Sequence, residues 1–347
     1  MTEISTIGLD IAKRVFQVHG VDAAGTVVLR RQLRRSEVVR FFAKLPPCLV
    51  GIEACATAHY WGREIATLGH RVRLMPPTRV KPYVKWGKKN DRVDAQACCE
   101  AVSRPSMQFV PLKSVPEQAA LMSHRARQLL VEQRTRLANA IRGHLAELGI
   151  IARKGQAGLA ALLALIERPE APHLPAEIRP ILAVLAEQWR SLGPQITALE
   201  RQILAWHKSN ADSLRLATIP QFGPIVSSAL VATAGTAKRF ASGRQFAAWI
   251  GLEPAQNSTG GKERLGGITK SGDRYLRRLL VIAATGLIRR ARAKPASSPW
   301  FAQLLNRMPP RKATVALANK MARIAWAGLA KQTTYRAPPL TTAVLVG

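Results

Sequence analysis

The fold is decided by residues 4–33, which read ISTIGLDIAKRVFQVHGVDAAGTVVLRRQL. This stretch contains three apolar runs rich in β-branched residues, separated by two short polar turns. Such a pattern predicts strands over residues 4–11, 15–21 and 26–33. Because the connections are short, we expect the three strands to form a β-meander.

The pattern then alternates between helices and strands as far as Pro76. Polar starts and a glycine stop bound the helices, and short apolar runs give the strands. The predicted elements are a helix over 36–44, a strand over 48–53, a helix over 60–68 and a strand over 71–75. This order is that of the RNase H or RuvC-like fold, in which parallel strands extend the meander and helices pack on the sheet.

Longer helices are predicted beyond a proline-bounded linker. Residues 119–148 carry an apolar stripe at helical spacing, and residues 182–206 are the expected antiparallel partner. The pair is interpreted either as a hairpin or coiled coil that mediates assembly, or as an ordinary bundle within one subunit. From Leu214 onward short helices and glycine-rich turns follow, and residues 219–223 suit a helix-hairpin-helix or a plain helix-turn-helix unit.

We therefore expect an α/β amino-terminal RNase H/RuvC-like domain, a helical coiled-coil region and a mainly α carboxyl-terminal domain. The predicted boundaries are residues 1–112, 113–210 and 211–335.

The charge balance indicates an anionic partner. Lys and Arg number 52 against 21 Asp and Glu, which gives a formal net charge of +31. Nucleic acid is the expected partner, because each cation that neutralises a phosphate releases condensed counterions. A membrane surface is disfavoured, since the basic residues run through the whole chain and the apolar run at 279–288 is too short to span a bilayer. Without a signal-peptide pattern, we expect a cytoplasmic protein with reduced, buried cysteines.

Four acids of the amino-terminal domain stand where catalytic ligands are expected. Asp10 interrupts the apolar end of the first predicted strand, and Glu53 ends the fourth. Those strands are neighbours in this topology, so we expect the two carboxylates to converge at one edge of the sheet. Asp91 and Asp94 are three residues apart at a helix start, which places both on one face of that helix.

Taken singly, each acid has an ordinary structural explanation. Asp91 would be a helix N-cap and Asp94 a partner of the helix dipole, while Asp10 and Glu53 would be capping or turn residues. Taken together, in a chain so rich in cations, they suggest an all-oxygen cage for Mg²⁺ or Mn²⁺. Ions held in this way activate an attacking oxygen and stabilise the leaving oxygen of a phosphodiester, so we predict phosphoryl transfer.

Several segments carry a resemblance to a known family. In the amino-terminal domain they are Asp10, GIEAC at residues 51–55, HYW at 59–61 and KNDRVDA at 89–95. These segments look like those of the DEDD-type transposases of bacterial insertion sequences, specifically insertion-sequence family one-hundred-and-ten, eleven-eleven subgroup. The resemblance spans nearly the whole chain, and it implies that Asp10, Glu53, Asp91 and Asp94 hold the catalytic metal.

The most specific part of the resemblance lies in the carboxyl-terminal domain, at residues 246–280. It implies a serine, just before a glycine, that attacks DNA and forms a covalent phosphoserine link. Counting back from Lys270 assigns this role to Ser258, whereas the residue directly before Gly260 is Thr259, the alternative nucleophile. The expected nucleic-acid contacts, which would offset developing charge, are Lys262, Lys270, Arg277 and Arg278.

The resemblance also implies the partners. These are double-stranded donor and target DNA, a structured guide RNA encoded by the element, and a homo-oligomer, from dimer to tetramer, whose active site is shared between protomers. The charge alone indicates nucleic acid and not guide pairing. Since the sequence places no histidine as a base for the serine, metal would have to lower the pKa of the hydroxyl, which requires the two domains to meet.

Two other functions are compatible with the sequence. A RuvC-type junction resolvase or metal-dependent nuclease would cut with activated water and form no covalent protein–DNA species. A non-catalytic nucleic-acid-binding protein would use the acids only structurally and would show no metal-dependent cleavage.

Overall fold

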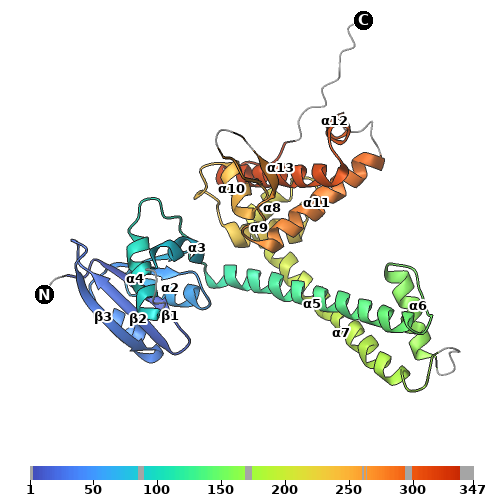
Figure 1. Cartoon of the computed structure of the whole chain (residues 1–347), viewed down its shortest axis with the longest axis horizontal. Coiled ribbons are helices and arrows are strands. Elements are labelled where there is room, and N and C mark those ends of the chain that lie inside the picture. Colours follow the sequence, from blue (N-terminus) through green and yellow to red (C-terminus); the bar gives the residue numbers. More distant parts are fainter. Residues whose placement is uncertain are drawn as a thin grey trace, which may run out of the picture. The chain divides into compact units, whose positions relative to one another are not determined.

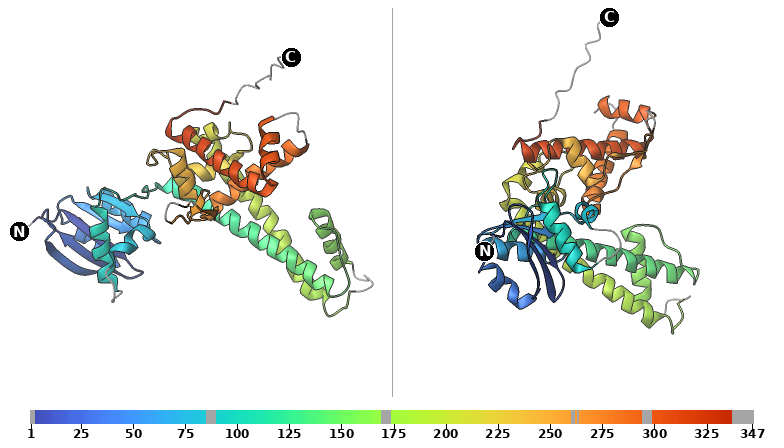
Figure 2. Two further views of the ribbon diagram at one scale, coloured as in Figure 1. Left: turned by 45° about the horizontal axis from the view of Figure 1, so that its top comes forward. Right: turned by 60° about the vertical axis from the view of Figure 1, so that its left-hand side comes forward.

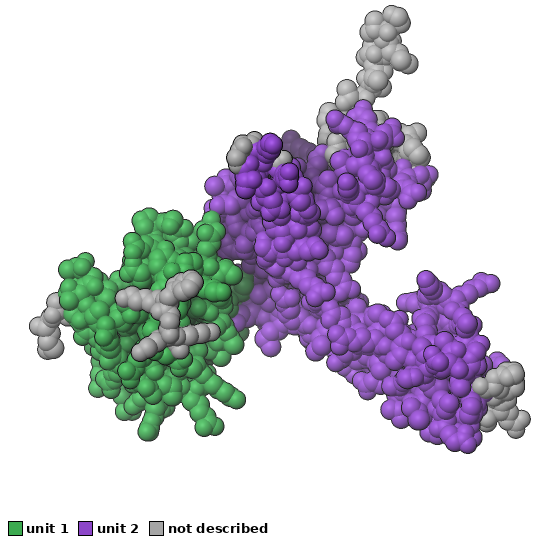
Figure 3. All heavy atoms as spheres, in the orientation of Figure 1, with its two compact units in different colours: residues 1–116 green, residues 117–347 purple. Residues whose placement is uncertain are grey.

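The computed structural model of the chain describes residues 3–84, 90–168, 174–259, 262, 264–293 and 299–336. The chain divides into two compact units, Met1–Pro116 and Glu117–Gly347 (Figure 3). The first unit is a mixed α/β domain and the second is mainly helical (Figure 1). Within the described ranges no helix has the length and apolarity to cross a membrane. The finer division at residues 112 and 210 stays a prediction.

A five-stranded sheet forms the first unit. Its strands lie in the order β3-β2-β1-β4-β5, with the β1–β2 and β2–β3 pairs antiparallel and the β1–β4 and β4–β5 pairs parallel. The predicted meander and its parallel extension are therefore confirmed, and the topology is compatible with an RNase H-like domain. The strands are β1 (Thr6–Ile11), β2 (Val15–Val21), β3 (Val27–Arg34), β4 (Leu49–Glu53) and β5 (Arg71–Met75).

Helices cover both faces of this sheet. On one face, α1 (Val38–Phe42) and α2 (Ala58–Thr67) bury an apolar core that includes Ile7 and Leu9 of β1. On the other face lies α4 (Asp91–Val102), which packs over β1, β2 and β4. The remaining short helices of this unit are η1 (Arg35–Glu37), α3 (Pro77–Val80) and η2 (Lys81–Tyr83).

Glycines let α4 approach the sheet closely. A Cβ added at Gly8 of β1 would lie 2.0 Å from the carbonyl oxygen of Ala95, and one at Gly51 of β4 would lie 2.6 Å from the Cβ of Val102. Ordinary side chains do not fit at such distances. The start of α4 is therefore fixed against the strands that carry the first two predicted acids.

One expectation about the cysteines is wrong. All four are free thiols, and three are buried as expected, but Cys55 is exposed. It lies in the loop between β4 and α2, beyond the last core residue of the strand.

The second unit begins with a helical hairpin. The helices α5 (Val115–Ala146) and α7 (Arg179–Ser209) lie side by side in both views of Figure 2, with α6 (Gln156–Glu167) packed near their distal ends. Polar contacts link them at the other end, where Arg127 pairs with Glu200 at 2.6 Å. The predicted pairing of these two segments is confirmed within one chain, whereas the coiled coil stays a prediction.

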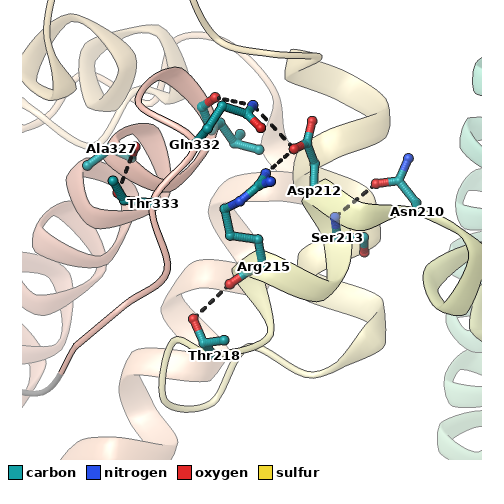
Figure 4. Close-up of polar contacts among 9 residues, drawn as sticks. Asn210, Asp212, Ser213, Arg215, Thr218, Ala327, Gln332 and Thr333 are labelled. Atoms are coloured by element: carbon teal, nitrogen blue, oxygen red, sulfur yellow. Dashed lines mark hydrogen bonds and ion pairs between the residues drawn. The ribbon is translucent and has the colours of Figure 1, made fainter.

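The rest of the second unit forms one further apolar core. The end of α13 is tied to the start of α8: Gln332 donates to Asp212 at 3.3 Å, Asp212 pairs with Arg215, and Asn210 caps the helix at Ser213 (Figure 4). The elements are α8 (Ala211–Leu216), α9 (Pro224–Ala234), α10 (Gly243–Ile250), β6 (Pro254–Gln256), β7 (Leu265–Ile268), α11 (Arg274–Ala293), α12 (Pro299–Arg307) and α13 (Pro310–Ala330).

The close packing of α4 predicts an effect of Gly8→Ala. The new methyl group would meet backbone atoms of Ala95 and Cys99, at 2.0 and 2.3 Å, which cannot move without moving the helix. We expect the free energy of unfolding to fall by ~1–3 kcal/mol or more, measured by denaturant unfolding of the full chain. The control is Gly143→Ala in α5, where an added Cβ meets nothing within 4 Å. Alanine is the better helix former by ~0.5–1 kcal/mol, so this variant should be more stable; equal losses in both would contradict the packing argument.

Candidate functional site

The four predicted acids lie at one end of the α/β domain. Asp10 is the penultimate residue of β1, and Glu53 is the last residue of β4. The parallel register pairs Leu9 with Ile52, so the two acids follow at adjacent positions of neighbouring strands. The two carboxylates therefore lie near each other because β1 and β4 are neighbours in the sheet, as expected.

Asp91 and Asp94 occupy the first turn of α4, the helix that covers this face of the sheet. The helix is capped by Asn90, whose side-chain oxygen accepts a hydrogen bond from the backbone N–H of Val93 at 3.0 Å. The alternative interpretation of Asp91 as the N-cap is therefore wrong. Both acids are left in a first turn where the helix dipole favours negative charge.

Electrostatics join the four acids into one group. The pKa of Asp10 is raised from its ordinary value of 3.8 to about 6, first by burial and then by the negative charges of Asp91, Asp94 and Glu53. A hydrogen bond from the backbone N–H of Ile11 acts in the opposite direction. Holding an ionised Asp10 among three other carboxylates thus costs free energy that an added cation would offset.

The acids nevertheless do not form a ready coordination shell. In the part of the chain that the structure describes, no three side chains of His, Cys, Asp or Glu gather closely enough to hold a metal ion. The donor set itself suits Mg²⁺ or Mn²⁺, because both ions prefer carboxylate oxygens. The residues therefore fit a divalent cation in chemistry and in charge, and binding would require the carboxylates to draw closer.

The two candidate nucleophiles lie in the second unit, in the hairpin formed by β6 and β7. Ser258 and Thr259 are both exposed. The Ser258 hydroxyl accepts a hydrogen bond from the backbone N–H of Arg264 at 3.4 Å, and Thr259 forms a bridge with Lys262. Among the described residues, no acid or histidine is hydrogen-bonded to the Ser258 hydroxyl. The glycines at 260 and 261 lie outside the described residues.

The four predicted nucleic-acid contacts have different surroundings. Lys262 and Lys270 are exposed, and Lys270 has a left-handed backbone with φ of 56°. Arg277 donates from Nη1 to the carbonyl oxygens of Ile250 and Ser271, both at 2.8 Å, so it holds the turn after the hairpin. Arg278 pairs with Glu132 of α5 at 3.4 Å. Their role as nucleic-acid contacts stays a prediction.

A buried polar network below the hairpin was missed by the sequence analysis. The ring of His124 in α5 is hydrogen-bonded through Nδ1 to the Tyr275 hydroxyl at 3.1 Å and through Nε2 to the Ser228 hydroxyl at 3.0 Å. Burial, with the nearby Arg127 and Arg125, lowers the pKa of His124 to about 4, so the ring is neutral. The network joins α5 to α9 and to the start of α11. Its only sequence signal is a histidine beside arginines in a helix, which says nothing about partners far along the chain.

An ion pair adds to this connection. Arg125 binds one carboxylate oxygen of Asp273 at 2.7 Å, while the other oxygen accepts from the backbone N–H of Leu276 at 2.9 Å. Asp273 thus caps the first turn of α11 and attaches it to α5 at once. The segment that follows the hairpin is therefore held in two places. Arg277 binds its backbone at Ser271, and Asp273 anchors the start of α11 to α5.

Comparisons with known proteins bear on both parts of the chain. Residues 7–150 match a DEDD-type family model described as "Transposase", and residues 213–300 match one described as "Transposase IS116/IS110/IS902 family". The chain is 52% identical to a probable family 20 transposase of Pseudomonas aeruginosa, over 96% of this chain and 99% of the relative. It is 40% identical to the transposase for insertion sequence element IS1111A of Coxiella burnetii, over 97% of this chain and 92% of the relative. It is 39% identical to the transposase for IS1328 of Yersinia enterocolitica, over 94% and 97%.

The raised pKa of Asp10 predicts that Asp10→Asn stabilises the protein in the absence of divalent cations. A carboxyl whose pKa rises from 3.8 to about 6 on folding supports the fold below pH 4 and loses that contribution as the pH rises to 6. At pH 7.5 in a chelator the variant should therefore be more stable, on the order of 1–2 kcal/mol after allowance for partial exposure. Thermal unfolding across this pH range measures the difference.

The matched control is Glu64→Gln, which removes a carboxylate from α2, on the opposite face of the sheet from α4. Added Mg²⁺ or Mn²⁺ should raise the melting temperature of the wild type more than that of Asp10→Asn, because binding to the folded state stabilises it. A loss of stability in Asp10→Asn at pH 7.5 would show that burial and the neighbouring carboxylates do not disfavour an ionised Asp10 as described.

Proposed function

Since the chain belongs to the IS116/IS110/IS902 family of transposases, we propose that it cuts and rejoins DNA strands with four carboxylates and a serine nucleophile. The observation that carries the proposal is the grouping of Asp10 with three other acids in a chain of net charge +31, where burial and then those acids raise the pKa of Asp10. Acids repel one another and are rare here, so their grouping needs a compensating function. Binding of divalent metal is the function that suits four carboxylates at the edge of such a sheet.

The proposed metal ligands are Asp10, Glu53, Asp91 and Asp94. Bound there, Mg²⁺ or Mn²⁺ would favour the ionised form of an attacking hydroxyl and offset the charge on a leaving oxygen. Asp10 and Glu53 supply oxygens from the rigid sheet, whereas Asp91 and Asp94 supply them from the first turn of α4. Because Gly8 lets α4 pack directly on β1, the two pairs of acids lie on the same face of the sheet.

The proposed covalent step begins at Ser258. Its Oγ attacks the phosphorus of a DNA phosphodiester, the bond from phosphorus to one deoxyribose oxygen breaks, and the serine proton passes to solvent while the released oxygen takes up a proton. A phosphoserine ester then replaces the broken ester. Since one phosphate ester is exchanged for another, a second deoxyribose hydroxyl can reverse the step on a new strand without an external energy source.

Ser258 is preferred over Thr259 for a steric reason. Both hydroxyls are exposed on the same hairpin, but threonine bears a methyl group on the carbon that carries the hydroxyl. The backbone of Thr259 is also engaged with Lys262, whose N–H donates to the Thr259 carbonyl oxygen at 3.1 Å. The primary hydroxyl of Ser258 is therefore the less hindered of the two.

The proposed partners are double-stranded donor and target DNA and a structured guide RNA. The excess of positive charge supports binding of phosphate backbones in general. A homo-oligomer, from dimer to tetramer, is proposed because strand exchange acts on two DNA molecules at once. Lys262 and Lys270, exposed near the nucleophile, are the proposed contacts that hold the cut strand, together with Arg277 and Arg278.

The main competing enzyme function is hydrolysis by a RuvC-type resolvase or nuclease. It would use the same carboxylates and would leave Ser258 without a role. The family membership favours strand transfer over hydrolysis, and a covalent protein–DNA species separates the two mechanisms experimentally.

Ser258→Ala should abolish the covalent protein–DNA species, because alanine lacks the attacking oxygen. The measurement is denaturing electrophoresis of full-length protein incubated with labelled donor DNA and Mn²⁺, followed by peptide mapping of the trapped adduct. Thr259→Ala is the matched control and should retain the adduct. Asp10→Asn should also lose it while still binding DNA. Phosphate mapped to Thr259 would move the nucleophile by one residue, and strand exchange without any adduct would exclude covalent catalysis.

Protein purified from cells that carry the whole element should contain one abundant structured RNA encoded by that element. The physical reason is that a tightly held guide survives purification, whereas nonspecifically bound RNA is lost as salt rises. The measurement is sequencing of the RNA that remains bound after washes of increasing salt. Bound RNA with no enrichment for the element would argue against guidance and leave the covalent chemistry untouched.

A further inference from the structure

A cavity lies on the same face of the α/β domain as the four acids. It has a volume of about 370 Å³ and is bounded by β2, β3 and the start of α4. We call it the β2–β3 pocket. The polar residues that line it are Gln17, His19, Arg30, Arg31, Gln32, Asn90, Arg92 and Gln96.

Strand pairing shows that this pocket and Asp10 share one face. Asp10 pairs with Gln17 across β1 and β2, and Gln17 pairs in turn with Gln32 across β2 and β3. Directly paired residues point to the same side of a sheet. The neighbouring row, Gly8 with His19 and Arg30, lies on the side where Gly8 contacts α4. The pocket is therefore the lateral continuation of the carboxylate site.

Two buried polar side chains in the pocket lack internal partners. Gln17 is 9% exposed and His19 is 5% exposed, yet neither has a side-chain hydrogen bond to any described residue. Among the described residues, Nε1 of Trp61 is the only side-chain polar atom that is inaccessible to solvent and has no hydrogen-bond partner, so the polar atoms of Gln17 and His19 are not cut off from solvent. The polar atoms of Gln17 and His19 therefore reach the pocket. Buried polar groups are normally hydrogen-bonded, so a ligand bound in the pocket would supply the hydrogen-bond partners that these two side chains lack within the protein.

The pocket is also positively charged. Neither Arg30 nor Arg92 has an ion pair with an acid among the described residues, and both are exposed. Burial, together with Arg30, lowers the pKa of His19, so its ring is neutral and offers one donor and one acceptor. Two guanidinium groups over neutral donors are the chemistry that recognises a phosphate group.

The distance to the carboxylates suits one strand of nucleic acid. Adjacent strands of a sheet are ~4.8 Å apart, so the pocket, which spans β2 and β3, lies ~5–10 Å from β1. A DNA strand rises ~3.4 Å per nucleotide along the helix axis. A strand whose phosphodiester lies at Asp10 would thus place a phosphate one to three nucleotides away at the pocket.

We infer that the β2–β3 pocket binds a backbone phosphate of the DNA strand that is cut, one to three nucleotides from the phosphodiester at the carboxylates. The inference rests on the proposed function of the carboxylates. Arg30 and Arg92 bind the phosphate oxygens, and Gln17 and His19 donate to them from below. The pocket positions the strand and takes no part in bond breaking, so Gln17, His19, Arg30 and Arg92 are positioning residues.

Arg30 and Arg31 provide a matched test. They are adjacent cations that point to opposite faces of β3, and Arg31 borders the pocket without directing its guanidinium into it. The guanidinium of Arg31 lies over the ring of Phe41, 5.7 Å from its centroid, away from the carboxylate face. Full-length Arg30→Ala and Arg31→Ala are compared with wild type for binding to a fluorescein-labelled DNA duplex, and to single-stranded DNA and RNA of the same sequence, in a chelator across a salt series. Arg30→Ala should weaken DNA binding by about 3- to 10-fold and reduce the log–log salt slope by roughly one unit.

A second variant tests the neutral groups. The double substitution of Gln17→Leu with His19→Leu removes hydrogen-bond donors and no charge, so it should weaken DNA binding and leave the salt slope unchanged. Correct folding of each variant is checked by its unfolding transition. Equal effects of Arg30→Ala and Arg31→Ala would overturn the inference, because the pocket would then act only through general positive charge. A loss confined to RNA would also overturn it, by assigning the pocket to a guide strand.

The carboxylate mechanism and the phosphate site can be tested separately. Asp10→Asn retains the pocket, so it should bind DNA with the wild-type salt slope and fail to cut. If Asp10→Asn still cuts while Arg30→Ala weakens binding, the carboxylate mechanism is wrong and the phosphate site stands.

Discussion

The site depends on the contact between α4 and the glycines of β1 and β4. Gly8 and Gly51 give up side-chain packing so that a helix backbone can lie directly on the sheet. That contact places the first turn of α4, with two acids, opposite the strand ends that carry two more. Burial and then the charges of the three other acids raise the pKa of Asp10, so the packing holds this carboxyl where its ionised form is disfavoured. Tertiary packing therefore keeps the carboxylates in an arrangement that the proposed cation would make more favourable.

The arrangement of the sheet and the position of the acids could be predicted because both follow from local rules. Alternation and short turns set the strands, and the order of the elements makes β1 and β4 neighbours. The polar residues Gln17 and His19 also left a signal, since they alternate with apolar residues on β2 and share a face with Asp10. Their significance could not be read from the sequence, because the pocket needs β3 and α4 to close it.

Other features depend on contacts between distant parts of the chain. His124 meets Tyr275 across 151 residues, and no periodicity predicts which buried hydroxyl a histidine will find. Arg277 was expected to contact nucleic acid, yet its guanidinium also holds two backbone carbonyls of the turn after the hairpin. The exposure of Cys55 follows from a loop whose course the adjoining strand does not fix. Sequence patterns fix the elements, and the partners of their polar side chains are set by how the elements pack.

The contacts around the hairpin that carries Ser258 have the form that the proposed covalent step on DNA would require. A serine that must reach a phosphate and later release it needs an accessible hydroxyl, which Ser258 has. The hairpin that carries this serine must also be rigidly supported, because a displacement of about 1 Å in a reacting atom can cost a hundredfold in rate. The turn below the hairpin is held by Arg277, and α11 is attached to α5 through Asp273 and the neutral His124. A charged histidine at that buried position would be unstable beside two arginines, so its low pKa keeps the support intact across the pH range in which the carboxylates are ionised.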